Sequence, residues 1–125
     1  DYRFGRGADA VTLRIGQRSE ALAGLFASSG FDCGVFITAY NPLGQALSVE
    51  ANEAAHERLV AELKGLSGRV VDAAGADPSG DWPEEKSLFA LGVDLKSARN
   101  LGVRYRQDAV VWVDESAVPQ LILLR

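Results

Sequence analysis

The stretch from residue 34 to residue 40 constrains the fold more than any other part of the chain. Its side chains are apolar on both faces apart from Thr38, as expected of a central strand that is covered on two sides. The segment Asn41-Pro42-Leu43-Gly44 follows at once and breaks the strand, because proline cannot continue a ladder of hydrogen bonds. A buried strand that runs into a polar turn before a helix is a common place for a binding site.

Periodicity and capping residues predict the elements around this strand. Alternating or short apolar runs predict further strands, at residues 11–15, 69–73, 88–93, 109–113 and 119–124. Three helices are predicted from caps and apolar stripes: Ser19 to Gly30, 49–66 behind Ser48, and Asp94 to Gly102. The order β-α-β-α-β-β-α-β-β indicates an α+β (mixed α/β) fold, in which a single mixed β-sheet of about five to six strands carries three helices. We expect one globular domain over residues 1–125.

Charge and composition narrow the classes of function. The net charge is −4, which disfavours binding of nucleic acid through its phosphate backbone. The single cysteine, Cys33, excludes an internal disulfide and a cysteine-based zinc cluster. No apolar run approaches the roughly 20 residues of a membrane span, and no signal peptide is visible. We therefore expect a cytoplasmic protein without a cofactor or a membrane anchor. The sequence contains no methionine, so we expect that residue 1 is not the native start.

One polar side chain interrupts the apolar stripe of the longest predicted helix. On a helical wheel with Leu59 at zero, Leu63 falls at about +40°, Leu66 at about −20° and Asn52 at about +20°. A buried amide costs on the order of 1–3 kcal/mol unless its hydrogen bonds are satisfied. Two explanations follow: Asn52 holds the loop of residues 41–47 against the helix, or it contacts a ligand.

Two other reactive side chains have plainer explanations. His56, the only histidine, lies at the edge of the same stripe and could act as a general base, but the spacing implies no carboxylate partner. A partly buried or solvated helix histidine is the simpler explanation. Cys33 opens the central strand and could act with His56 as a thiol nucleophile, but cysteine is among the most buried residue types, which favours core packing.

The segment from Asp72 to Glu85 contains five acids and no base. Carboxylates on a loop rich in glycine and proline could bind calcium or magnesium, but their spacing does not match an EF-hand, and we predict no metal site. Within the segment, Trp82 places a large aromatic ring before a strand. Glu85 and Ser87 should face one side of that strand. Glu85 could serve as an acid or base, or accept a capping hydrogen bond.

A basic cluster surrounds the last predicted helix and its exit. Its members are Lys96, Arg99, Arg104 and Arg106. The cluster could bind an anion such as a phosphate, or it could form a solvated rim paired with the acidic segment. The sequence has no glycine-rich phosphate loop, no G-x-S-x-G elbow and no H-E-x-x-H motif, so no standard catalytic motif identifies a site.

An ordered set of motifs resembles a known family. The motifs are Thr38-Ala39-Tyr40-Asn41-Pro42, then Asn52, then Trp82-Pro83-Glu84-Glu85 with Ser87, and finally Gln107-Asp108-Ala109. Together they resemble the bacterial domain-of-unknown-function family 3293 over nearly the whole chain, although Asp108 stands where that family usually has asparagine. The resemblance implies a small, soluble, mostly bacterial protein with no established activity.

The resemblance and the residues themselves direct attention to the same polar side chains. We predict that these converge at one end of the sheet and line a polar pocket that binds a small polar or nucleotide-like ligand. The predicted ligand-binding residues are Thr38, Tyr40, Asn41, Asn52, Trp82, Ser87 and Gln107. Whether the protein is an enzyme stays open; if it is one, Glu85 is the candidate catalytic acid or base in hydrolysis or group transfer, with Ser87 positioning it.

A protein–protein interaction module is the alternative, for example an inhibitor, an immunity-type protein or an antitoxin-like partner. The same polar residues would then form a structural network that fixes the 41–47 and 75–86 loops. A deep pocket containing Asn52 and Glu85 would support ligand binding, whereas a flat apolar patch elsewhere would support a protein partner. Nucleic-acid binding through the arginines of the basic cluster is a third and weaker hypothesis.

Overall fold

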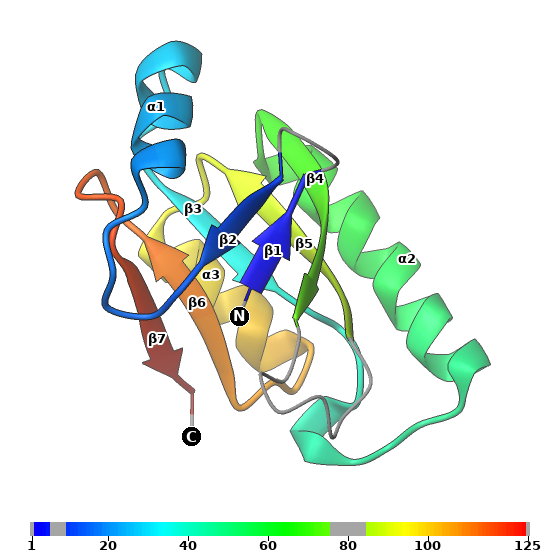
Figure 1. Ribbon diagram of the computed structural model, residues 1–125. Coiled ribbons are helices and arrows are strands. Elements are labelled where there is room, and N and C mark those ends of the chain that lie inside the picture. Colours follow the sequence, from blue (N-terminus) through cyan, green and yellow to red (C-terminus); the bar gives the residue numbers. More distant parts are fainter. Residues whose placement is uncertain (1, 6–9, 76–84, 125) are drawn as a thin grey trace.

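A computed structural model describes residues 2–5, 10–75 and 85–124 of the chain. Within these ranges three helices pack on a seven-stranded sheet (Figure 1). The α-helices are α1 (Glu20–Ser29), α2 (Val49–Leu66) and α3 (Leu95–Arg104), and a short 3-10 helix, η2, spans Pro42–Gly44. The strands are β1 (Tyr2–Phe4), β2 (Val11–Leu13), β3 (Gly34–Ile37), β4 (Arg69–Gly75), β5 (Glu85–Leu91), β6 (Ala109–Val113) and β7 (Pro119–Leu123).

The predicted helix starts are confirmed. Ser19, Ser48 and Asp94 each precede a helix, and their side chains accept hydrogen bonds from backbone N–H groups in its first turn. Gly30 ends α1 in the left-handed conformation, with φ of 81°. Gly102 does not close the last helix as predicted. It is buried inside α3, which continues to Arg104, and its missing side chain makes room for Leu124 and for Val110 of β6.

The seven strands form one antiparallel sheet in the order β2-β1-β4-β5-β3-β6-β7. The α+β class is confirmed, but two details of the prediction were wrong. All described pairings are antiparallel rather than mixed. The strand count exceeds the predicted five to six, because β1 has only three residues and so shows no measurable alternation.

The antiparallel pattern arises because two helical connections interleave. Strands β3 and β4, which α2 joins, run in the same direction, but β5 lies between them. Strands β5 and β6, which α3 joins, also run in the same direction, and β3 lies between them. Each connection therefore crosses over one strand that runs the opposite way.

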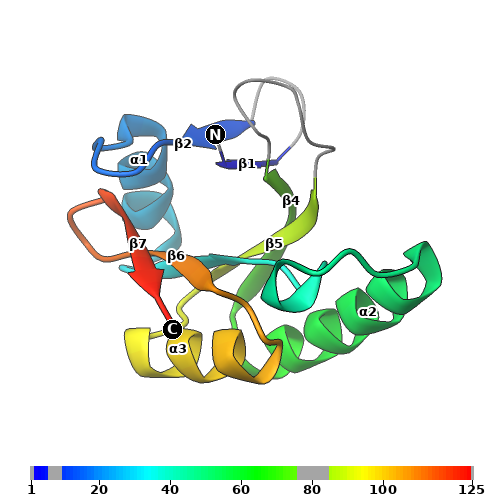
Figure 2. The ribbon, with the colours of Figure 1, turned by 90° about the horizontal axis from the view of Figure 1, so that it is seen from below.

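The handedness of the connections places the helices on the sheet. Right-handed crossovers put α2 and α3 on one face and α1 on the other, as Figure 2 shows. The central strand β3 is buried at all four positions. Phe36 packs in the core on the α1 face, whereas Val35 and Ile37 pack in the core under α2 and α3. The prediction of a strand covered on both faces is confirmed, although the strand ends at Ile37.

Gly34 provides a test of how tightly the two cores hold this strand. A Cβ atom there would lie 2.6 Å from Cζ of Phe89, a fully buried ring stacked on Phe4. We expect Gly34→Ala to lower the free energy of unfolding by about 1–3 kcal/mol. Gly24 is the matched control, because a Cβ atom at this position in α1 meets nothing within 4 Å. Gly24→Ala should raise the stability by about 0.5–1 kcal/mol. Urea unfolding measures both, and wild-type stability in Gly34→Ala would contradict this packing.

Candidate functional site

The polar site begins where β3 ends and the chain turns away from the sheet. The hydroxyl of Thr38 donates a hydrogen bond to the carbonyl oxygen of Lys86 on β5, at 2.9 Å, and accepts one from the backbone N–H of Tyr40, at 3.0 Å. Thr38 therefore ties the first residues of the connection to the neighbouring strand. We refer to residues 38–47 as the 38–47 loop.

The loop is joined to α2 by a pair of amides. The backbone N–H of Asn41 donates to Oδ1 of Asn52, at 3.0 Å, and Nδ2 of Asn52 donates to Oδ1 of Asn41, at 2.9 Å. Asn52 is only 5% exposed, so these two bonds satisfy an amide that would otherwise be costly to bury. The contacts correspond to the first explanation of Asn52, in which it holds the loop. A direct contact between Asn52 and a ligand stays a prediction.

Asn41 connects this pair to a third segment. Its Nδ2 donates to Oε2 of Glu85 at the start of β5, at 3.1 Å. Its Oδ1 accepts a second bond, from the backbone N–H of Leu47, at 3.2 Å. One side chain thus links α2, β5 and both ends of the loop. Glu85 and Ser87 do face one side of β5 as predicted, but the buried hydroxyl of Ser87 donates to the carbonyl oxygen of Glu85 within its own strand.

A fourth segment reaches the loop from the connection between α3 and β6. Nε2 of the buried Gln107 donates to the carbonyl oxygens of Tyr40 and Tyr105, both at 3.1 Å. Nearby, the backbone N–H of Leu43 donates to the carbonyl oxygen of Arg106, at 2.6 Å. The predicted convergence therefore holds for Thr38, Tyr40, Asn41, Asn52, Glu85 and Gln107. Ser87 contacts this group only through its hydrogen bond to the backbone of Glu85, and Trp82 lies outside the described residues.

Backbone strain is concentrated at this junction. Among the described residues, four that are not glycine have positive φ, and three of these lie here: Asn41 at 47°, Leu43 at 55° and Arg106 at 55°. Asparagine tolerates this conformation, but for residues such as leucine it costs on the order of 1–2 kcal/mol. Strained backbone persists where the surroundings fix it, and it clusters at functional sites.

A second cluster of titratable groups lies on the α2 face beside Tyr40. The Tyr40 hydroxyl donates to Oε1 of Glu53, and Nζ of Lys86 lies 3.2 Å from Oε2 of the same carboxylate. The bond to Glu53 raises the pKa of Tyr40 to about 12, and the same bond, with Lys86, lowers the pKa of Glu53. The Tyr40 ring meets the ring of His56 edge to face, with centroids 6.2 Å apart.

His56 is buried more deeply than the sequence predicted. It is 2% exposed, and its Nδ1 has no hydrogen-bond partner among the described residues. Burial lowers the pKa of His56, and the charge of Lys86 lowers it further, against the opposing effect of Glu53, Glu57 and Asp72. The imidazole is therefore held in its neutral form at neutral pH.

A groove of about 830 Å³ lies on the other side of the 38–47 loop, between the loop, α2 and the α3–β6 connection. Its apolar lining is Ala39, Pro42, Leu47, Ala51, Ala55 and Ala61. Its polar lining is Arg58, Glu62, Arg104, Tyr105 and Arg106. We refer to it as the arginine groove. Of the predicted basic cluster, Arg104 and Arg106 line the groove, whereas Lys96 and Arg99 do not.

Glu62 organises one wall of the arginine groove. Its carboxylate lies 2.5 Å from Nη2 of Arg104 and accepts a hydrogen bond of 2.8 Å from the Tyr105 hydroxyl. Burial, together with this bond, raises the pKa of Tyr105 to about 12, so the phenol keeps its proton. Sequence reasoning missed Arg58. Its spacing in the sequence could have identified it, because residues 51, 55, 58 and 62 repeat at the helical interval and share one face of α2.

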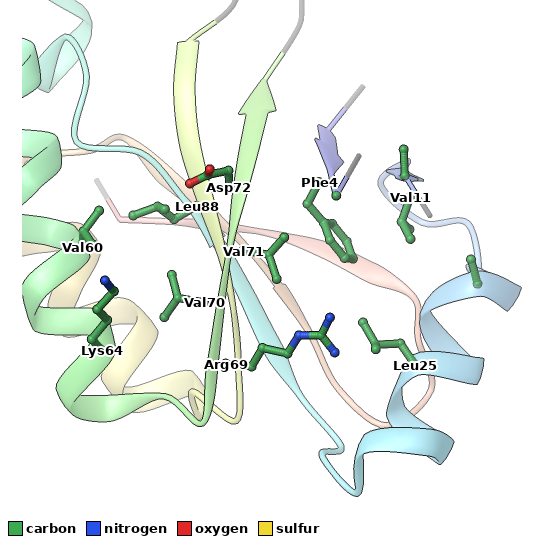
Figure 3. A pocket seen from close by; sticks show the side chains of 13 residues that line it. Phe4, Val11, Leu25, Val60, Lys64, Arg69, Val70, Val71, Asp72 and Leu88 are labelled. Atoms are coloured by element: carbon green, nitrogen blue, oxygen red, sulfur yellow. The ribbon is translucent and has the colours of Figure 1, made fainter. Parts of the chain in front are cut away.

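A larger cavity of about 910 Å³ lies across β4, between α2 on one side and β1, β2 and α1 on the other (Figure 3). Valines 60, 70 and 71 and other apolar side chains dominate its lining, and Lys64, Arg69 and Asp72 are its charged members. None of the predicted site residues lines it. It is separate from the polar network and brings no convergent set of polar groups together.

The described ranges contain neither a metal-binding cluster nor a membrane-spanning helix. In residues 2–5, 10–75 and 85–124, no group of three or more His, Cys, Asp or Glu side chains could hold a metal ion. Most of the acidic segment of the sequence, including Asp77, Asp81 and Glu84, lies outside these ranges. None of the described helices is long and apolar enough to cross a membrane.

Asn52 tests whether the polar network supports the fold. Asn52→Ala removes both bonds to Asn41, which leaves the backbone N–H of Asn41 without its partner and its Oδ1 with only the bond from Leu47. We expect the free energy of unfolding to fall by about 2–3 kcal/mol. Glu57→Ala, an exposed change on the same helix, should alter it by less than about 0.5 kcal/mol. An unchanged or raised melting temperature in Asn52→Ala would instead indicate a residue kept for ligand contact.

His56 makes stability depend on pH in a defined direction. Because its pKa in the folded state lies below the ordinary value of 6.5, the unfolded chain binds the proton more readily. The contribution of His56 is fully present above pH 6.5 and is lost as pH falls from 6.5 through the folded pKa. We expect urea unfolding to show a steeper loss of stability below pH 6.5 in the wild type than in His56→Gln. Parallel curves would contradict the buried, neutral imidazole.

Comparison with known proteins places the chain in a family. The family described as "Protein of unknown function (DUF3293)" matches residues 37–110, more than half of the chain. The match begins at the last residue of β3 and ends within β6, so it includes the whole polar network and the arginine groove. No curated protein and no solved structure matches significantly. The chain belongs to this family of unknown function.

Proposed function

We propose that this DUF3293 protein binds a small polar ligand with an anionic group, such as a nucleotide, in the arginine groove. The observation that carries the proposal is the meeting of Arg58, Arg104 and Arg106 in one concave surface of about 830 Å³. Grooves of several hundred Å³ are the usual size of small-molecule sites, which combine an apolar lining with a few convergent polar groups.

The charge of the groove supports an anionic ligand. The whole chain carries −4, whereas the groove has three arginines against the single carboxylate of Glu62. Glu62 is engaged by Arg104 and Tyr105. Arg58 and Arg106 have no carboxylate partner among the described residues, so their guanidinium groups are available to an incoming anion. Arginine binds phosphate and carboxylate groups through paired N–H donors in a fixed plane.

The apolar lining suits a flat ring next to that anion. Three alanines of α2 and Ala39 of the loop present small side chains, which leave room for a planar group to lie against the helix. Pro42 and Leu47 add apolar contact at the loop side. A planar heterocycle joined to an anionic group satisfies both parts of the groove, which is why a nucleotide-like ligand is the best match.

In this proposal the polar network positions the groove. Asn41, Asn52 and Gln107 fix the backbone of the 38–47 loop, and that loop carries Ala39, Pro42 and Leu47 into the groove wall. Direct ligand contact by Thr38, Tyr40, Asn41, Asn52, Trp82, Ser87 or Gln107 is a different proposal, because the described members of this set do not line the groove and would need a second binding surface. It predicts that amide substitutions weaken binding without lowering stability.

A protein–protein interaction module remains the second candidate. The observation that favours it is that Asn41 and Asn52 satisfy each other within the chain, as a structural network would. A partner protein would then bind a surface that leaves the arginine groove unused. Retained partner binding after substitution of the groove arginines would favour this candidate.

Binding of nucleoside monophosphates tests the proposal. We expect a panel of them to raise the melting temperature, whereas the matching nucleosides without phosphate raise it less. Arg58→Ala should raise the dissociation constant, measured by titration calorimetry, about tenfold or more. The reason is that a hydrogen bond to a charged group contributes about 1.5–3 kcal/mol. Arg99→Ala is the matched control, since Arg99 is an exposed arginine of α3 outside the groove. Absence of any thermal shift, or equal losses in both variants, would contradict the proposal.

A further inference from the structure

The last strand of the sheet, β7, has an edge whose backbone groups can be assigned from its pairing with β6. The N–H of Leu124 donates to the carbonyl oxygen of Asp108, at 2.8 Å, in register with the β6–β7 ladder. Backbone groups alternate in an antiparallel pair. The groups of Gln120 and Ile122 therefore face β6, and those of Pro119, Leu121 and Leu123 face away from the sheet.

One end of this outer edge is already closed. Pro119 has no N–H group, and its carbonyl oxygen accepts a hydrogen bond from Gly16, at 2.9 Å. The N–H and carbonyl groups of Leu121 and Leu123 have no partner among the described residues. Their side chains are 45% and 65% exposed. The open part of the edge thus consists of the outward-facing N–H and carbonyl groups of Leu121 and Leu123, which Ile122 separates.

We propose that a second copy of this chain pairs with β7 along this edge. A two-fold axis at Ile122 places Leu121 of each copy opposite Leu123 of the other, and each such pair exchanges both backbone hydrogen bonds. The exposed leucines then meet across the strands on one face. Proteins usually protect an open edge with charged residues, but Pro119–Leu123 contains none, so no like charges face each other across the axis.

The size of the contact sets its strength. A stable complex buries about 800 Å² per partner, and one short strand with two leucines falls well below this area. The dimer is therefore weak and depends on concentration, with a dissociation constant in the micromolar range or above. The inference is independent of ligand binding in the arginine groove, which lies on the α2 face.

Sedimentation equilibrium from about 10 μM to 1 mM tests the pairing in the wild-type chain. Leu123→Pro removes an outward N–H that β6 does not use, and Leu121→Lys places like charges near the axis. Each should weaken dimerisation at least tenfold. Leu66→Lys is the control, since Leu66 is 51% exposed at the end of α2 and should leave the dimer unchanged. Circular dichroism checks the fold, and Leu121→Lys decides the outcome if Leu123→Pro does not fold.

The position of the contact is tested by amide NMR of the wild type over the same concentrations. Shifts that grow with concentration at Leu121, Ile122 and Leu123 would support the pairing. A chain that remains monomeric at 1 mM would overturn it. So would a dimer that survives Leu121→Lys, or shifts confined to another part of the molecule.

Discussion

The paired amides of Asn41 and Asn52 are the interaction on which the candidate site depends. Asn52 occupies a position in α2 where the apolar stripe would otherwise place a leucine, and its amide is satisfied by the turn after β3. The same Asn41 side chain also binds Glu85 and the end of the loop. Without this pair, the hydrogen bond from Tyr40 to Glu53 would still join the loop to α2, but the turn at Asn41 would lose its link to the helix, and the strained conformations at Leu43 and Arg106 would lose a nearby support.

The fold explains why four distant segments can meet at this point. Strands β5 and β3 are neighbours, so the start of β5 lies beside the end of β3, and Glu85 comes close to Asn41. The α3–β6 connection brings Gln107 to the same end of the sheet, because β6 is the other neighbour of β3. The central strand β3 therefore positions the segments that form the site. Its burial on both faces holds it in place.

Much of this could be predicted from the sequence, for reasons that particular residues make clear. The buried amide at position 52 required a partner, and the turn formers at residues 41–44 supplied the nearest one. Caps such as Ser48 and Asp94 act over one helical turn, so local sequence predicts them well. The interleaved order of β3, β4, β5 and β6 was not predictable, because strand adjacency depends on long-range packing. Arg58 was missed because a charged residue on an amphipathic helix resembles an ordinary solvated one until α3 is placed beside it.

The interleaving of β3, β5 and β4 also has a consequence for how the chain folds. Strands β4 and β5 follow each other in sequence and pair over seven positions, so their hairpin forms with little loss of chain entropy. Strand β3 pairs with the free edge of β5. This pairing closes a loop of roughly 50 residues. The bonds from Asn41 to Glu85 and from Gln107 to Tyr40 span this closure. We therefore expect the candidate site to be assembled late in folding, after the helices and the hairpin of β4 and β5.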